Sequence, residues 1–160
     1  MAILGILLAV SLPSFQQTIE SNMTNSQAKL FLTSLSLARS EAIKRGGNVG
    51  ICASNDGIDC GAGEWNEGWI VFHDANEDAN GAAGSLDAGD TIIRVFDSMG
   101  ASAVTTFSVN WIAYNSLGYS AIAGTQTLLI CPASGTAANA RSIEIGPSGR
   151  GRRIEDGLAC

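Results

Sequence analysis

The chain has 160 residues, with nine basic and fifteen acidic side chains and a net charge of −6. This length suits one globular domain with its own core and is short for two, and the acidic balance argues against a broadly basic nucleic-acid-binding protein. Four of the nine basic residues nevertheless follow position 140. A local cationic region within an acidic protein is therefore compatible with the composition.

The first twelve residues, MAILGILLAVSL, are apolar on every face, and a lone proline follows them. They are too few to span a bilayer, which takes about 20 residues, and they lack the basic start and cleavage site of an export signal. Three interpretations stay open: a buried helix, about half of a membrane helix whose start precedes this sequence, or an interfacial anchor. Pro13 removes one backbone donor, so we expect a kink or local melting there.

From Ser14 onward the apolar residues recur at helical spacing, which predicts an amphipathic helix. Gly46 and Gly47 follow two cations and predict its end. We therefore expect a helix over residues 1–46, divided into an anchor (1–13) and an amphipathic spine (14–46). The apolar positions of the spine are Phe15, Ile19, Met23, Phe31, Leu35, Ala38 and Ala42.

After Gly47 the pattern changes to short β-like runs separated by turn residues. Several connections are short enough for hairpins, which favours antiparallel pairing over a parallel α/β sheet. The predicted fold is α+β: a long kinked helix whose second half packs on an antiparallel β domain formed by residues 47–160. The expected strands are Val49–Ala53, Trp69–His73, Thr91–Phe96, Val104–Asn110, Thr127–Cys131, Ser142–Ile145 and Arg152–Ile154.

The four cysteines show none of the spacings typical of a zinc site. An even count and a cysteine at the last position predict two disulfides, and hence an oxidising compartment such as the periplasm or the cell surface. Of the three connectivities we favour pairing in sequence order, Cys52 with Cys60 and Cys131 with Cys160. The first bridge would close a turn, and the second would hold a tail that otherwise frays.

The order of these features resembles the minor pilin family that includes FimT and FimU of type IV pili and the H-type minor pseudopilin of type II secretion. The resemblance covers essentially the whole chain. It rests on the apolar helix with Pro13 and on three segments, which read LARSEAIKRGGNVGICAS (37–54), EWNEGWIVFHDANED (64–78) and IEIGPSGRGRRI (143–154). The family's leader and mature start are absent from the sequence, so Met1 is expected to lie inside the hydrophobic helix and no processing residue is assigned.

The resemblance implies a single-pass subunit of the inner membrane with a periplasmic domain, which joins other pilin subunits through its helix and reaches the cell surface in the pilus. The small residues Ala2, Gly5 and Ala9 suit close helix packing in lipid or in a bundle. An ordinary buried helix is disfavoured, because the rest of the chain is too small to bury it.

The tail matches a Gly-Arg-x-Arg motif, with which FimT-type pilins bind DNA during natural transformation. The resemblance therefore implies a partner, double-stranded DNA. Arginine forks suit phosphate oxygens, and about three phosphate contacts would give weak, salt-sensitive binding without sequence preference. No aromatic residue lies within the motif, so the local sequence does not support base stacking. The predicted DNA-binding residues are Gly149, Arg150, Gly151, Arg152 and Arg153.

A purely structural interpretation of the same residues is an edge strand whose charges block aggregation or pair with Glu155 and Asp156. Two other members of the family would share the fold without binding DNA: a FimU-type subunit that primes the pilus and a type II secretion pseudopilin. A soluble periplasmic enzyme is the alternative of another class. We predict no enzyme activity, no catalytic residue and no cofactor, because the sequence holds neither a nucleophile motif nor a nucleotide-binding loop.

The loop 74–90 alternates oxygen-bearing side chains as a calcium loop does. It departs from the EF-hand pattern, since Ala79 occupies the glycine position and Ser85 the final glutamate position. We expect a plain acidic surface loop and no metal. The side chains concerned are Asp74, Asn76, Asp78, Asn80, Asp87 and Asp90.

His73, the one histidine, is expected to be a structural residue at a strand end, because no triad partners accompany it. The three tryptophans are expected to pack in the core and at the sheet edge, with ligand stacking as the less favoured alternative. They are Trp65, Trp69 and Trp111.

Overall fold

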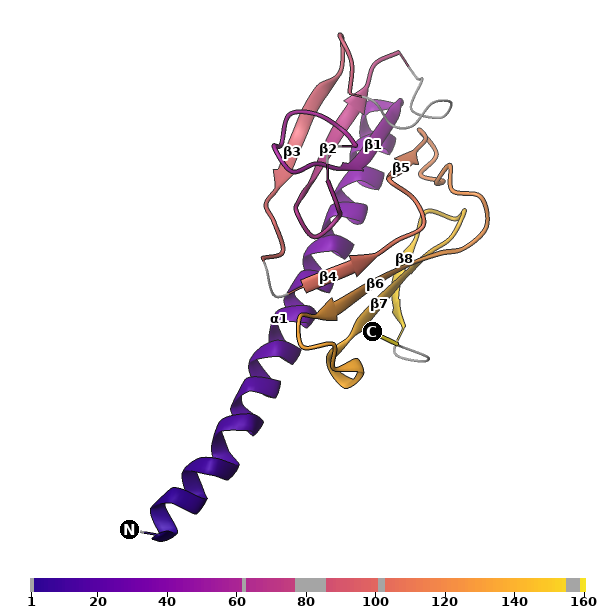
Figure 1. Ribbon diagram of the computed structural model, residues 1–160. Coiled ribbons are helices and arrows are strands. Elements are labelled where there is room, and N and C mark those ends of the chain that lie inside the picture. The colour runs from indigo at the N-terminus through magenta and orange to yellow at the C-terminus, as the bar shows by residue number, and fades with distance from the viewer. Residues whose placement is uncertain (1, 62, 77–85, 101–102, 155–158) are drawn as a thin grey trace.

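The computed structural model describes residues 2–61, 63–76, 86–100, 103–154 and 159–160. One long helix, α1 (Ala2–Arg45), projects from a domain built of two antiparallel sheets (Figure 1). Its amino-terminal part extends away from the sheets, and its second half packs between and against them. The predicted α+β architecture is confirmed.

The helix is unbroken at Pro13, and Figure 1 shows a rod without a sharp kink. The expected kink or melting at this proline is therefore wrong. A proline removes one hydrogen bond of the ladder, and the turns on either side keep the chain helical. The helix ends as predicted: Gly46 has a φ of 68°, and its N–H donates to the Ala42 carbonyl at 3.0 Å.

Burial on α1 begins near Thr24, later than the amphipathic pattern predicts. Phe31, Leu35, Ala38 and Ala42 are buried, whereas Phe15 is 67% exposed and Ile19 is 51% exposed. The sheets do not extend to the first turns of the spine, so these apolar side chains have nothing to pack against within the described chain.

The first sheet has the strand order β3-β2-β1-β5. Residues of β1 are buried at all six positions, because α1 covers one face of the sheet and a smaller apolar cluster of Cys52, Ile70 and Phe72 lies on the other. The strands are β1 (Asn48–Ala53), β2 (Trp69–Asp74), β3 (Thr91–Phe96) and β5 (Trp111–Tyr114).

The second sheet has the order β4-β6-β7-β8, so β8 is an edge strand. Its inner face contributes Leu128, Ile130, Ile143 and Ile145 to the core shared with α1. The strands are β4 (Ala103–Thr106), β6 (Gln126–Pro132), β7 (Arg141–Ile145) and β8 (Gly151–Ile154), and a short 3-10 helix, η1 (Ala137–Asn139), joins β6 to β7.

One predicted strand, Val104–Asn110, is wrong in its second half. The chain pairs with β6 only over Ala103–Thr106, then crosses to the first sheet and pairs with β1 as Trp111–Tyr114. The other six predicted strands lie within β1, β2, β3, β6, β7 and β8.

Both predicted disulfides are present. Cys52 is bonded to Cys60 across a short loop, and Cys131 is bonded to Cys160, which ties the last residue of the chain to β6. Pairing in sequence order is thus confirmed.

Candidate functional site

The predicted Gly-Arg-x-Arg motif begins in a tight turn between β7 and β8. The Gly149 N–H donates to the Gly146 carbonyl at 2.9 Å, and Gly149 has a φ of 73°. A Cβ at this position would clash with the carbonyl oxygen of Gly118. Gly149 is therefore required by the turn itself, because only glycine combines the left-handed backbone with this close approach.

Strand β8 alternates between two faces. Gly151 faces α1, where an added Cβ would lie 2.6 Å from Leu35 Cδ1. Arg153, two residues on, shares that face and donates from Nη1 to Asn25 Oδ1 of α1 at 2.7 Å. Arg152 lies opposite Glu144 of β7 and forms an ion pair with it at 2.8 Å.

The structure thus separates the predicted cations. Arg153 is bound to the helix, whereas the Arg152 side chain is 69% exposed despite its ion pair. Arg150 is exposed and has no hydrogen-bond or ion-pair partner in the described part of the chain. Arg150 and Arg152 are the members of the motif that are available to a phosphate.

Arg141, the fourth cation after position 140, has a structural position. Its guanidinium donates to Asn25 Oδ1 at 3.1 Å, to Ser21 Oγ at 2.9 Å and to the Ala140 carbonyl at 2.6 Å. Because Asn25 accepts from both Arg141 and Arg153, this side chain joins β7 and β8 to α1.

The loop 115–121, which follows β5, packs on the 146–149 turn. The Ser120 N–H donates to the Pro147 carbonyl at 3.1 Å, and the Ser120 hydroxyl donates to the Gly146 carbonyl at 2.8 Å. Arg39 of α1 donates from Nε to the Gly118 carbonyl at 3.0 Å. Local sequence patterns do not reveal this neighbourhood, because about 30 residues separate the loop from the turn.

Tyr114 lies beneath this contact and is fully buried. Burial raises the pKa of its phenol, and the charge of nearby Arg39 opposes the shift. The phenol therefore stays neutral at physiological pH. Its ring borders the position that a Cβ on Gly149 would take.

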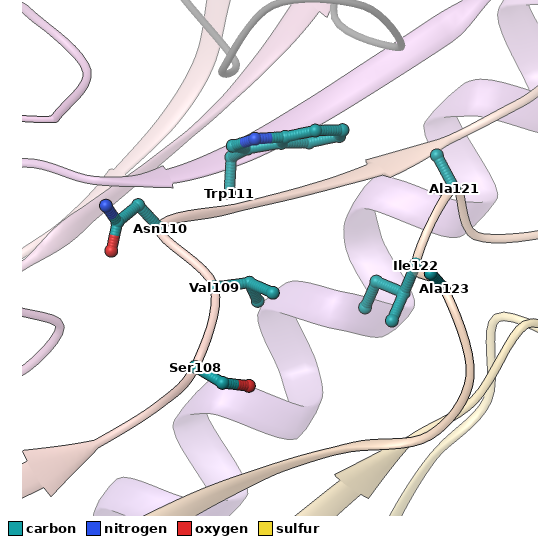
Figure 2. A pocket seen from close by; sticks show the side chains of 7 residues that line it. All are labelled: Ser108, Val109, Asn110, Trp111, Ala121, Ile122 and Ala123. Atoms are coloured by element: carbon teal, nitrogen blue, oxygen red, sulfur yellow. The ribbon is translucent and has the colours of Figure 1, made fainter.

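A cavity of about 390 Å³ opens between the 107–111 segment and the loop after Ser120. Figure 2 shows Val109 and Ile122 pointing toward each other beneath the Trp111 ring. The residues that line it are Ser108, Val109, Asn110, Trp111, Ala121, Ile122 and Ala123. None of these side chains is ionisable, so the pocket holds no acid–base pair for catalysis.

The other two tryptophans are buried in an aromatic cluster around Phe31, which contacts Trp65 and Trp69 edge to face at 5.4 and 5.5 Å. The packing interpretation is confirmed for these two side chains. Trp111 is half-buried, packs against the cluster of Cys52, Ile70 and Phe72, and lines the cavity.

The acidic loop lies partly outside the described residues, including Asp78, Ala79, Asn80 and Ser85. Within the described part, Asp90 accepts from the backbone N–H groups of Ala75 and Asp87, and Asp87 accepts from Asn76. No group of three or more His, Cys, Asp or Glu side chains is arranged for a metal there. His73 is half-buried in β2, opposite Val49.

Over the part of the chain that the structure describes, no helix combines the length and apolar character needed to cross a bilayer.

A sequence model of the type II transport protein GspH family matches residues 27–149. The match spans the packed half of α1, the whole first sheet and three strands of the second, and it ends at Gly149 in the turn before β8. No curated protein sequence matches.

Solved structures support the same fold. The type IV minor pilin FimU of Pseudomonas aeruginosa PAO1, in space group P21, has a TM-score of 0.63 and 21% identity, over 87% of this chain and 93% of FimU. The P65 crystal form of FimU has a TM-score of 0.59 and 20% identity, over 85% of this chain and 96% of FimU. The minor pseudopilin EpsH of the Vibrio cholerae type 2 secretion system has a TM-score of 0.55 and 16% identity, over 84% of this chain and 98% of EpsH. At these identities the likeness establishes the fold alone.

Proposed function

Since this chain belongs to the family of the type II transport protein GspH, we propose that it is a minor type IV pilin that binds double-stranded DNA. In this proposal Arg150 and Arg152 contact phosphates, and the protein contributes to DNA capture in natural transformation. Its role is structural and interactive and involves no enzymatic reaction.

The observation that supports the DNA proposal is the exposed, unpartnered position of Arg150 among the described residues. It is an exposed guanidinium, without a partner in the described chain, on a protein whose net charge is −6. A free arginine retains five donors for phosphate oxygens. Arg152 adds a second exposed cation, although Glu144 competes with phosphate for it. Two or three such contacts support weak and salt-dependent binding.

We further propose that the projecting half of α1 assembles with other pilin subunits and anchors the chain in the inner membrane beforehand, with the β domain in the periplasm and, after assembly, on the cell surface. Phe15 and Ile19 support assembly, because they lie one turn apart and are exposed. Replacing both by Ser is expected to reduce co-assembly with partner pilins without unfolding the β domain. Unchanged incorporation into filaments would contradict this role.

The DNA proposal is tested by fluorescence anisotropy of a labelled 20-base-pair duplex at low salt, titrated with the full chain. The variant Arg150→Gln/Arg152→Gln is expected to bind at least about tenfold more weakly, since it loses two phosphate contacts. The matched control Lys29→Gln/Arg94→Gln removes the same charge from exposed positions on α1 and β3. Equal weakening by both variants, or no weakening by the first, would contradict the assignment of DNA binding to Arg150 and Arg152.

A pseudopilin of type II secretion that does not bind DNA is the second candidate. The family model supports it, and it shares every feature of the fold. A FimU-type priming subunit is a third form of the same scaffold. Absence of duplex binding by the unmodified chain at low salt would select these two over DNA capture.

A further inference from the structure

We propose that Tyr119 and Arg150 together form a site that also binds single-stranded DNA, with an unpaired base on Tyr119 and a phosphate of the same strand on Arg150. This inference rests on the proposed DNA-binding function and adds a second substrate to it. The motif itself contains no aromatic residue, and the tertiary structure supplies one from a different part of the chain.

The 115–121 loop and the 146–149 turn lie side by side. Figure 1 shows the orange loop after β5 next to the yellow connection between β7 and β8, and Ser120 donates two hydrogen bonds to carbonyls of the turn. Gly118 and Gly149 touch through their backbones. Because consecutive Cα atoms are 3.8 Å apart, this contact keeps the Cα atoms of Tyr119 and Arg150 within about 14 Å. A strand that rises ~3.4 Å per nucleotide covers that span in about four nucleotides.

The loop backbone is held in one conformation. Asn115 Oδ1 accepts from the N–H groups of Leu117 and Tyr119, both at 3.0 Å. The Gly118 N–H donates to the Asn115 carbonyl at 2.8 Å, and the Asn115 N–H donates to the Tyr119 carbonyl at 3.0 Å. Arg39 holds the loop from the helix side through the Gly118 carbonyl. An aromatic side chain on such a loop loses little further entropy when it binds.

Tyr119 is 55% exposed, in contrast to the fully buried Tyr114 five residues earlier. Leu117, in the same loop, is 73% exposed. No acidic residue occurs in 115–121 or in 146–151, and Arg150 has no ion-pair partner among the described residues. An exposed aromatic residue and an exposed arginine on two segments in contact, with no carboxylate in either segment, match the stacking and phosphate contacts of single-strand binding sites.

The accessibility of the bases gives Tyr119 different roles in the two forms of DNA. In a duplex each base is stacked between neighbours and offers no free face, so only the arginines contribute. In a single strand a base is free to stack on Tyr119 while Arg150 binds a phosphate of the same strand, within about four nucleotides. Tyr119 is thus expected to affect single-strand binding selectively.

The test compares a labelled 20-nucleotide poly-dT with a 20-base-pair duplex, by anisotropy of the full chain at fixed low salt. Tyr119→Ala is expected to weaken poly-dT binding at least about fivefold and to change duplex binding less than twofold. Tyr119→Phe is expected to retain poly-dT binding, because it keeps the ring. Leu117→Ala, in the same loop, is the matched control and is expected to change neither affinity.

Several results would overturn the inference. They are poly-dT binding that is unaffected by Tyr119→Ala, equal losses for both DNAs, or equal effects of Tyr119→Ala and Leu117→Ala, the last being the result expected of a protein-docking patch. Duplex binding that depends on Arg150 and Arg152 but shows no role for Tyr119 leaves the proposed function intact. If the unmodified chain binds neither DNA, both proposals fail.

Discussion

Both sheets pack on α1, yet their outer faces differ. In β3-β2-β1-β5 the outer face buries Cys52, Ile70 and Phe72. In β4-β6-β7-β8 the corresponding face carries the Glu144–Arg152 ion pair, and all four residues of β8 are exposed or half-buried. A sheet that is covered on both faces has its residues dictated by packing, whereas a sheet with one solvated face has positions free for surface chemistry.

The largest expected effect contrasts the two outer faces directly. Ile70→Ala empties a fully buried site and is expected to lower the free energy of unfolding by about 2–5 kcal/mol. Leu129→Ala removes a half-buried side chain from the second sheet and is expected to cost about 1 kcal/mol or less. Urea denaturation followed by tryptophan fluorescence measures both. Equal losses would mean that the second sheet is also covered on its outer face.

The two disulfides should differ in the same experiment. In the chain-entropy model the Cys131–Cys160 bridge, with a separation of 29 residues, contributes about 3.6 kcal/mol, and Cys52–Cys60, with a separation of 8, about 2.5 kcal/mol. Double Cys→Ser variants of each pair are expected to rank in that order. The reverse order would indicate that the short loop stabilises the first sheet mainly by covering it.

Replacing Glu144 is expected to have a smaller effect on stability and to strengthen DNA binding. Glu144→Gln breaks an exposed ion pair, so the unfolding free energy should change by less than about 1 kcal/mol. It also frees Arg152, so duplex DNA is expected to bind about twofold to fivefold more tightly. Glu41→Gln, which removes a carboxylate paired with Lys44 and Arg45 on α1, is the control. Weaker binding by Glu144→Gln would show that the ion pair positions Arg152 for DNA.

The smallest effect concerns the loop closed by Cys52 and Cys60. Backbone N–H groups of Ile58 and Asp59 donate to Asp56 and lower the pKa of its carboxyl below the ordinary 3.8. A lowered pKa stabilises the fold above pH 3.8, and this contribution is lost as pH falls through the folded-state value. Asp56→Asn should therefore flatten the acid limb of the stability curve. An unchanged limb between pH 5 and pH 2 would contradict this.

Much of the fold was predictable from local patterns. The helix stop at Gly46, six of the seven expected strands and both disulfides follow from spacing and turn residues. The seventh strand failed because the chain changes sheets between Thr106 and Trp111, and β-propensity does not distinguish one long strand from two short ones in different sheets. The exposure of Phe15 and Ile19 was also missed, because helical periodicity shows which face is apolar but not what covers it.

The candidate site was predictable only as a set of residue types. The sequence by itself determined that a glycine turn leads three arginines into an edge strand near the end of an acidic chain. The tertiary structure decided that Arg153 binds Asn25, that Arg152 pairs with Glu144 and that Arg150 has no partner among the described residues. It also placed the loop that carries Tyr119 against the turn that precedes Arg150. Those outcomes depend on strand register and on contacts between segments far apart in the chain, which local sequence patterns do not encode.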